Sequence, residues 1–363
     1  MSVVLTCQNF FDGFILHGPR KITVDHDVVV RVEPYEGRVD HHLVSPGLVD
    51  IQMNGFGSID VSRATAFELA SLGDELALLG TTSWLGTITT APLEVLSRSV
   101  SSLHEAFSTG KIAGFAGIHV EGPFLGNAPG AHRPDWIIPF DEDWCSRLPK
   151  SIRLMTVAAE QTDASGAIRR LTQRDITVSV GHSRPTEAQW QQARDAGATV
   201  VTHLFNGMSG VHHRDAGLAL SALVDDGVYT GLIADMVHVS PQAVALAFKA
   251  KGGSRVCLVS DSVAWQSEWA LKRHIAVKDG APRLPDGTLA GSSTPLAECV
   301  RLAVTEAGVP LRDALCAATS TPASAVGLTD VGQIHEGSPA DLIAFDQSLH
   351  VVSTWSRLVS IRG

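Results

Sequence analysis

Four polar residues stand at the ends of short apolar runs, and together they could hold a divalent metal ion. Glu121 closes the run that ends in I-H-V, His182 follows T-V-S-V-G, and His203 follows V-V-T. Asp261 follows C-L-V-S in the same way. Carboxylates and imidazoles are common ligands of such ions, and a carboxylate beside one can move a proton. The pattern predicts a metal-dependent hydrolytic site in which Asp261 acts as general base and then as general acid.

An earlier stretch, P-G-L-V-D-I-Q-M-N-G at residues 46–55, carries two amides, Gln52 and Asn54, two positions apart. Strand geometry puts both on one face, at a spacing where many metal-dependent hydrolases have a pair of histidines. Neutral amides are poor ligands for a transition metal beside imidazole and carboxylate. We therefore interpret both residues as groups that shape the site. His119 shares the face of Glu121 across Val120, and we assign it a structural or supporting role.

The elements that must position these residues alternate between strand and helix. Short runs rich in β-branched residues are typical of buried parallel strands, and they alternate with segments of helical spacing such as residues 185–197. The clearest runs occupy residues 112–120, 151–160, 175–182, 198–205, 230–235 and 256–261. About eight such alternations predict an α/β fold, a (β/α)8 TIM barrel with its active site at the carboxyl ends of the strands. A doubly wound open sheet is the alternative, but no G-x-G-x-x-G follows the first run.

The two ends of the chain have a different pattern. Short apolar runs separated by turns indicate a small β-sandwich domain formed from residues 1–48 and 331–363, which leaves residues 49–330 for the barrel. Within the barrel, residues 265–293 contain D-G twice and predict a turn-rich insertion with a hairpin.

Composition narrows the class of protein. The chain has 363 residues, 44% of them hydrophobic, and a formal net charge of −10, which argues against a nucleic-acid partner. Its five cysteines are scattered singly, as expected of reduced thiols in the cytoplasm. The first residues lack the features of a signal peptide, and no run of 18 apolar residues predicts a membrane span. We expect a cytoplasmic protein that does not bind a membrane.

Several longer motifs together resemble one enzyme family. They are P-G-L-V-D-I-Q-M-N-G, H-V-E-G-P-F-L (119–125), G-A-H (130–132), V-G-H-S (180–183), T-H-L-F-N-G-M (202–208), R-D-A-G-L (214–218), I-A-D-M-V-H-V (233–239), V-S-D-S (259–262) and L-A-G-S (289–292). In this order, across nearly the whole chain, they resemble the N-acetylglucosamine-6-phosphate deacetylases of the amidohydrolase superfamily. This branch has Gln-x-Asn where the two-metal members have His-x-His, so the resemblance implies a single metal ion per subunit.

The resemblance also implies roles for individual residues. Glu121, His182 and His203 would bind the metal, Asp261 would be the catalytic acid and base, and His132 would stabilise the oxyanion. The sugar pocket would be lined by Ala131, Asn206 and Gly207, and the backbone around Leu289 would close over the acetyl group. The 6-phosphate would be bound by Arg214 and His238. In this family the phosphate-binding arginine can come from the neighbouring subunit, which implies a homodimer. The ligand set suits Zn²⁺ best, although Fe²⁺, Co²⁺ and Ni²⁺ accept it too.

The expected reaction is the hydrolysis of N-acetylglucosamine 6-phosphate to glucosamine 6-phosphate and acetate, and three alternatives stay open. They are the galactosamine epimer as substrate, another N-acyl substrate, and a non-catalytic amidohydrolase-like scaffold. The pairing of Arg214 with His238 favours a phosphorylated substrate, and the complete set of polar residues argues against a scaffold. Gly207, Ser209 and Ser293 depart from the family pattern, and all three lie in motifs expected around the sugar.

Overall fold

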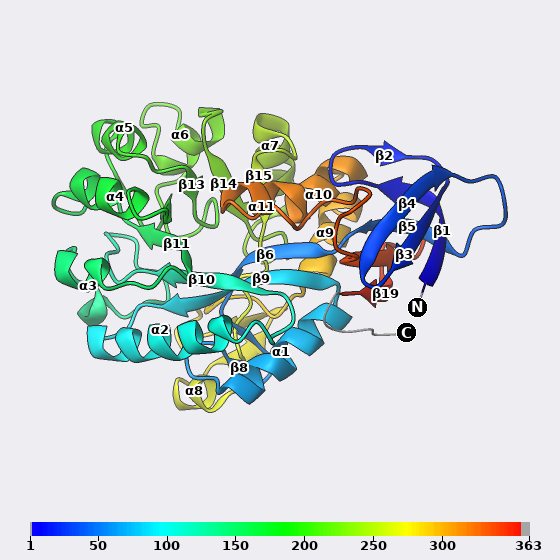
Figure 1. Cartoon of the computed structure of the whole chain (residues 1–363). Coiled ribbons are helices and arrows are strands. Elements are labelled where there is room, and N and C mark those ends of the chain that lie inside the picture. The colour runs from blue at the N-terminus through cyan, green and yellow to red at the C-terminus, as the bar shows by residue number, and fades with distance from the viewer. Residues whose placement is uncertain (1, 357–363) are drawn as a thin grey trace.

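Eight parallel strands form the central sheet of the protein (Figure 1), whose computed structural model describes residues 2–356. In spatial order they are β6 (Leu48–Met53), β9 (Thr81–Thr89), β10 (Phe115–Glu121), β11 (Ile152–Val157), β12 (Thr177–Val180), β13 (Val200–Val201), β14 (Tyr229–Leu232) and β15 (Val256–Leu258). The chain beyond β15 returns to β6, because Asp261 N donates to Gln52 O at 3.0 Å and Asn54 N to Ser262 O at 2.9 Å. These bonds complete the barrel and bring Asp261 beside Gln52 and Asn54.

Helices cover the outside of the barrel, which explains why its strands are apolar on both faces: every residue of β6 is buried. The helices are α1 (Ala66–Leu78), α2 (Leu93–Ser108), α3 (Glu142–Ser146), α4 (Ala164–Thr172), α5 (Glu187–Asp195), α6 (Leu218–Val224), α7 (Pro241–Lys251), α8 (Glu268–Lys272), α9 (Leu296–Thr305), α10 (Leu311–Ala318) and α11 (Ser320–Ala325). Thr65 and Thr186 begin α1 and α5 with capping boxes, which satisfy backbone N–H groups at each helix start.

Strands from both ends of the chain join in a second, mixed sheet beside the barrel (Figure 1). Its members are β1 (Ser2–Phe11), β2 (Leu16–His17), β3 (Arg20–Asp25), β4 (Val28–Pro34), β5 (His41–Pro46), β18 (Leu342–Phe345) and β19 (Val351–Trp355). β1 and β5 are parallel, whereas β18 is antiparallel to both β5 and β19. The sheet has its own apolar core, which includes Phe10, Ile22 and Leu342.

The predicted fold class is confirmed, since a (β/α)8 barrel is accompanied by a small β domain from both termini. The chain passes from the terminal sheet to the barrel between β5 and β6; the domain limits at 48/49 and 330/331 stay a prediction, and residues 357–363 of the predicted terminal domain lie outside the described residues. The predicted insertion contains α8 and a hairpin of β16 (Ala276–Lys278) and β17 (Ala281–Arg283).

Two further findings concern the class of protein. Over residues 2–356, no helix has the length and apolar character needed to cross a membrane. All five cysteines are buried and free of disulfide bonds.

Candidate active site

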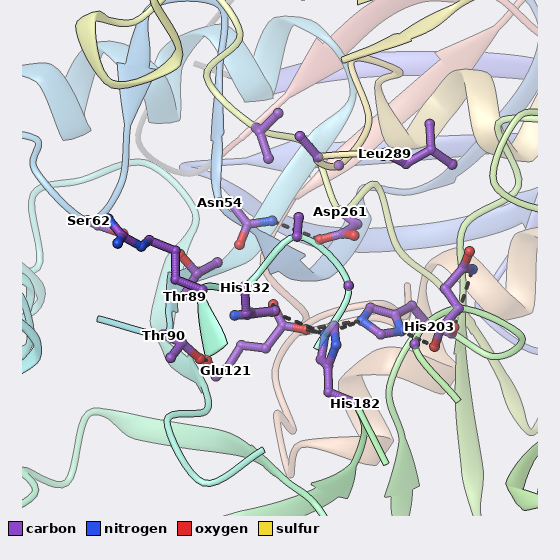
Figure 2. Close-up of a pocket in the computed structure, with 18 of the residues that line it drawn as sticks. Asn54, Ser62, Thr89, Thr90, Glu121, His132, His182, His203, Asp261 and Leu289 are labelled. Atoms are coloured by element: carbon purple, nitrogen blue, oxygen red, sulfur yellow. Dashed lines mark hydrogen bonds and ion pairs between the residues drawn. The ribbon is translucent and has the colours of Figure 1, made fainter. Parts of the chain in front are cut away.

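The barrel brings Glu121, His182, His203 and Asp261 together at the carboxyl ends of its strands (Figure 2). Glu121 is the last residue of β10, and the other three follow β12, β13 and β15 within a few positions. His182, His203 and Asp261 have positive φ angles of 48°, 29° and 46°, a region that costs a non-glycine residue on the order of 1–3 kcal/mol. The surrounding hydrogen bonds must therefore hold these three residues in place.

Glu121, His182 and His203, which we call the donor cluster, form a compact group of possible metal ligands. Glu121 Oε1 lies 3.2 Å from His182 Nε2 and 3.1 Å from His203 Nε2, and the two Nε2 atoms are 3.0 Å apart. His182 Nδ1 donates to Ala128 O at 3.0 Å, and His203 Nδ1 donates to Asn206 O at 3.1 Å. Because a neutral imidazole carries one proton, these bonds leave both Nε2 lone pairs directed at the carboxylate. Three electron-rich atoms in this arrangement fit a divalent cation.

The titration of the donor cluster supports the same interpretation. Burial opposes the charge of Glu121, but the adjacent rings of His182 and His203 outweigh it and hold the pKa of the carboxyl well below its ordinary value. Burial also disfavours the charged form of His203. The contact with Glu121 and the charges of Glu121 and Asp261 outweigh this effect and raise the pKa of His203. The cluster thus keeps an ionised carboxylate in a buried place and attracts positive charge.

His132 lies at the edge of the donor cluster and is the alternative to His203 as its second nitrogen ligand. Its Nε2 is 3.2 Å from His182 Nε2 and 3.9 Å from Glu121 Oε2, and these three residues alone could also hold an ion. However, His132 Nδ1 has no hydrogen-bond partner within residues 2–356, whereas His182 and His203 each donate to a carbonyl as metal-bound histidines do. Burial and His182 lower the pKa of His132 to about 3, so its ring is neutral. The geometry therefore favours His203 as the ligand.

Gln52 and Asn54 link the donor cluster to Asp261. Gln52 Nε2 donates to Glu121 Oε1 at 3.2 Å and to Asp261 Oδ1 at 3.1 Å, and Asn54 Nδ2 donates to the same Oδ1 at 2.8 Å. Both amides present N–H groups to carboxylates here, and an amide can bind a metal only through its oxygen. Burial and the charge of Glu121 raise the pKa of Asp261 to about 6, close to the value that suits proton transfer near neutral pH.

A cavity of about 230 Å³ opens in front of these groups. Among the predicted substrate residues, those that line it are Ala131, Asn206, Gly207, His238 and Leu289. His238 is oriented by Asp235, whose Oδ2 accepts from His238 Nδ1 at 2.7 Å. Arg214 does not line the cavity and is exposed in the segment before α6.

Comparisons with known proteins match this arrangement over most of the chain. A model of the amidohydrolase family matches residues 43–360. The chain belongs to this family. It is 33% identical to the N-acetylgalactosamine-6-phosphate deacetylase of Shewanella sp. (strain ANA-3), with 85% of this chain and 80% of that protein covered. It is 32% identical to the N-acetylglucosamine-6-phosphate deacetylase of Bacillus subtilis (strain 168), with 90% and 87% covered.

A solved structure resembles this amidohydrolase over almost its full length. It is a mutant of the N-acetyl-D-glucosamine-6-phosphate deacetylase from Mycobacterium smegmatis in complex with N-acetyl-D-glucosamine-6-phosphate. The TM-score is 0.90 at 30% identity, and 98% of each chain is covered. The resemblance inferred from the sequence motifs is confirmed, and so is the barrel fold.

Several residues of this amidohydrolase line the cavity although the sequence did not point to them: Arg63, Arg133, Trp136, Trp269 and Arg273. They come from the segments that follow β6, β10 and β15, Trp269 from the short helix α8, and no periodic pattern there marks a residue as facing a site. The only local signal is the short spacing of arginine and tryptophan in R-P-D-W and W-A-L-K-R.

His119 lies beneath the donor cluster and supports it, in agreement with its assigned role. Its ring is fully buried between Thr87 Oγ1 at 3.2 Å and Thr156 Oγ1 at 2.8 Å. Burial lowers the pKa of His119 to about 4, so that the ring stays neutral. Thr156 continues to Thr202 at 2.9 Å, which extends the polar network below the site.

Proposed function

We propose that this protein hydrolyses the acetamide of N-acetylglucosamine 6-phosphate to glucosamine 6-phosphate and acetate. The observation that carries the proposal is the convergence of a donor cluster and a separate carboxylate, Asp261, on one cavity. Both relatives named above deacetylate an N-acetylhexosamine 6-phosphate, and the similar structure contains such a sugar. The set of possible ligands and the carboxylate are complete, which argues against a non-catalytic scaffold.

One divalent ion per subunit, Zn²⁺ by preference, would be held by Glu121, His182 and His203. When bound, such an ion polarises the scissile carbonyl and lowers the pKa of water, so that a nucleophile is available at neutral pH. Iron, cobalt and nickel suit the same ligands. Gln52 and Asn54 keep the place of a second ion occupied by N–H groups, which supports a single ion.

Asp261 would move the proton. Its Oδ1 already accepts two amide N–H groups, and its Oδ2 has no hydrogen-bond partner among the described side chains. Oδ2 is therefore available to take a proton from the attacking water and return it to the leaving nitrogen. Such transfer contributes about 10²–10⁴-fold to a rate. His132 would donate an N–H to the oxygen on which negative charge develops.

The sugar would lie against Ala131, Asn206, Gly207 and Leu289, with its 6-phosphate near His238. Arg214 would reach this phosphate from the neighbouring subunit of a homodimer, because it does not line the cavity of its own chain. A guanidinium group suits a phosphate through two parallel hydrogen bonds. We also propose that the enzyme works in the cytoplasm, and that the barrel of residues 49–330 and the terminal domain of residues 1–48 and 331–363 form its two domains.

The galactosamine epimer is the second candidate substrate. Relatives that act on N-acetylgalactosamine 6-phosphate and on N-acetylglucosamine 6-phosphate are 33% and 32% identical to this chain, so overall similarity does not separate the two sugars. They differ only in the orientation of one hydroxyl group, at C4.

The test is acetate release from both 6-phosphates and from unphosphorylated N-acetylglucosamine, with metal per chain measured in the same sample. We expect rapid turnover of the glucosamine compound, slow turnover of the unphosphorylated sugar and about one ion per chain. Faster turnover of the galactosamine compound would reassign the substrate. Bound metal without turnover of any of the three would overturn the proposal.

A further inference from the structure

Three arginines gather at one side of the cavity mouth, and we call them the arginine rim: Arg63, Arg133 and Arg273. Each of the three guanidinium groups lies near a tryptophan ring. The guanidinium of Arg133 lies 4.7 Å from the ring centre of Trp136, whereas Arg273 and Arg63 lie 5.1 and 5.9 Å from that of Trp269. Arg273 also donates to Ala131 O at 3.1 Å, so it is fixed directly beside the predicted catalytic His132.

The charge of the arginine rim is only partly balanced. Arg63 pairs with Asp60 at 2.5 Å and Arg133 with Asp135 at 3.5 Å, but Arg273 has no carboxylate within 4.0 Å among residues 2–356. Burial and the charges of Arg133 and Arg63 lower the pKa of Arg273, which shows that like charges are held close together. Arg273 is partly buried, so an anion beside it would interact more strongly than it would with a fully solvated guanidinium.

The arginine rim is not the proposed phosphate end of the cavity. Its residues follow β6, β10 and β15, whereas His238 follows β14, which lies across the ring from β10. In Figure 2, Ser62 and Thr89 lie at one end of the pocket and His203 at the other, with Asn54 and Asp261 between them.

We propose that the arginine rim binds a second anionic group of the substrate, a carboxylate carried on the sugar ring near the acetamide. This inference rests on the proposed function. The contact of Arg273 with Ala131 places the rim next to the reacting amide, so a short acidic substituent on O3, adjacent to C2, would reach it while the 6-phosphate occupies the opposite end. Guanidinium groups pair with carboxylates through two parallel hydrogen bonds. The substrate class is then an N-acetylhexosamine 6-phosphate that bears a carboxyalkyl ether.

The test compares N-acetylglucosamine 6-phosphate with its 3-O-lactyl ether, N-acetylmuramic acid 6-phosphate. We expect the wild type to show a kcat/KM at least about tenfold higher for the lactyl compound, and Arg273→Ala or Arg133→Ala to remove this preference. Arg31→Ala is the matched control, because Arg31 is exposed on β4, pairs with Glu33 at 2.9 Å and lines neither the cavity nor the hollow at the rim, so the preference should remain.

Two results would overturn this inference while leaving the proposed function intact. One is equal turnover of both compounds by the wild type. The other is an equal loss on both compounds in Arg273→Ala, which would assign the rim to the 6-phosphate. If neither compound is hydrolysed, the proposed function fails. Calorimetric binding of both compounds to Asp261→Asn then tests the inference about the arginine rim on its own. Equal affinities would overturn this inference, and tighter binding of the lactyl compound would support it.

A second inference comes from an unpaired buried atom, Asn54 Oδ1. Asn54 is 8% exposed and lines the cavity. Its Nδ2 must face Asp261, where it donates at 2.8 Å, so the orientation of the amide is fixed. Oδ1 then has no partner within the described part of the chain. A buried acceptor without a partner is costly, which makes this oxygen a natural acceptor for a donor that the substrate brings.

We infer that Asn54 Oδ1 accepts the N–H of the scissile amide, an inference that also rests on the proposed function. Water adds to the carbonyl carbon and its proton passes to Asp261 Oδ2. The same proton then moves to the nitrogen as the C–N bond breaks and its electron pair stays on nitrogen, which gives the amine and acetic acid; the acid loses its remaining proton to solvent as acetate. Since Asn54 adjoins Asp261, the bond to Oδ1 would turn the nitrogen lone pair toward the proton donor. Asn54 is thus a positioning residue for the leaving group.

The test uses an ester that lacks the N–H, 2-O-acetylglucose 6-phosphate. We expect Asn54→Ala to lower kcat/KM for the amide about tenfold more than for the ester. Gln52→Ala is the matched control, because Gln52 donates to the same Asp261 oxygen at 3.1 Å and should affect both substrates equally. If Asn54→Ala does not fold, Asn54→Ser replaces it in the same comparison of amide and ester. Equal losses on both substrates overturn the inference, and a wild type that hydrolyses neither compound overturns the proposed function with it.

Discussion

The donor cluster and the arginine rim border the same cavity but are built in opposite ways. Each residue of the donor cluster ends or closely follows a barrel strand, is buried, and has partners that fix its ring or carboxylate. The rim residues stand on loops; Arg63 and Arg133 are about half exposed, and the contacts that hold them are mainly tryptophan faces.

This difference separates two tasks within one site. Strand ends belong to a rigid scaffold and hold the reacting groups in a fixed geometry, whereas loops can vary without disturbing the barrel. We therefore expect changes in the donor cluster to abolish the reaction, and changes in the arginine rim to alter which substrate is preferred. The predictions below test this division, beginning with the largest effect.

Removal of one proposed metal ligand should have the largest effect. His182→Ala is expected to lose the bound metal and to lower kcat at least about a thousandfold, because polarisation by the ion is worth several kcal/mol. Metal per chain and acetate release measure the two effects. His104→Ala is the control, since His104 is half-buried and bonds Ser151 Oγ at 3.0 Å outside the cavity. Full activity of His182→Ala without metal would remove His182 from the ligands.

Asp261→Asn should separate metal binding from proton transfer. Its Oδ1 can still accept from Gln52 and Asn54, so the site should stay assembled and keep its metal. Loss of the proton carrier should lower kcat by about 10²–10⁴-fold with little change in KM. Single-turnover acetate release and calorimetric substrate binding measure these effects. A variant with normal turnover would contradict the assignment of Asp261 as acid and base.

The rigid half of the site could be predicted from the sequence because its residues mark the ends of buried strands. Glu121, His182, His203 and Asp261 each follow an apolar run, and the carboxyl ends of parallel strands meet at one end of a barrel. Gln52 and Asn54 were predictable as a pair for the same reason. The order of the strands follows from the alternation of strand and helix, so the barrel itself was predictable too.

The loop half of the site could not be predicted in the same way. Trp269 and Arg273 belong to a region predicted only as a turn-rich insertion, and nothing in its composition shows that it folds over the cavity. Their place depends on a close approach of the loops after β6, β10 and β15, which are more than 60 residues apart in sequence. Long-range contacts of this kind leave no periodic pattern.

Arg214 should have an intermediate effect that depends on the substrate. Arg214→Ala is expected to raise KM for the 6-phosphate about 10- to 100-fold and to leave unphosphorylated N-acetylglucosamine unaffected, because a charge-assisted pair with phosphate is lost. Equal effects on both sugars would remove Arg214 from the phosphate site.

Mixed dimers test whether Arg214 acts across subunits. Arg214→Ala and Asp261→Asn chains are combined in equal amounts after reversible dissociation. A site that takes Arg214 from its neighbour is complete in one half of each mixed dimer, so roughly a quarter of the wild-type activity should return. No recovery, in a sample shown to contain mixed dimers, would mean that each subunit uses its own arginine.

Replacement of Asp50 should have the smallest effect, a change in the free energy of unfolding alone. It lies in β6, fully buried, and accepts the backbone N–H groups of Gln52 at 3.1 Å and Ser260 at 3.3 Å. Burial raises the pKa of Asp50 to about 7, so the folded state holds this proton more tightly than the unfolded state does. Its stabilising contribution is complete below about pH 4 and is lost as the pH rises through about 7.

Chemical denaturation between pH 5 and pH 8 measures this effect, with Asp50→Asn as the comparison. The wild type should lose roughly 2–4 kcal/mol of unfolding free energy more than the variant over this range, because the variant has no carboxyl to ionise. Metal should be removed from both proteins, so that ligand titration does not contribute. If the free energy of unfolding depends on pH in the same way in both proteins, Asp50 is ionised in the folded state. A buried carboxylate at this position would then need no cation, unlike the carboxylate of the donor cluster.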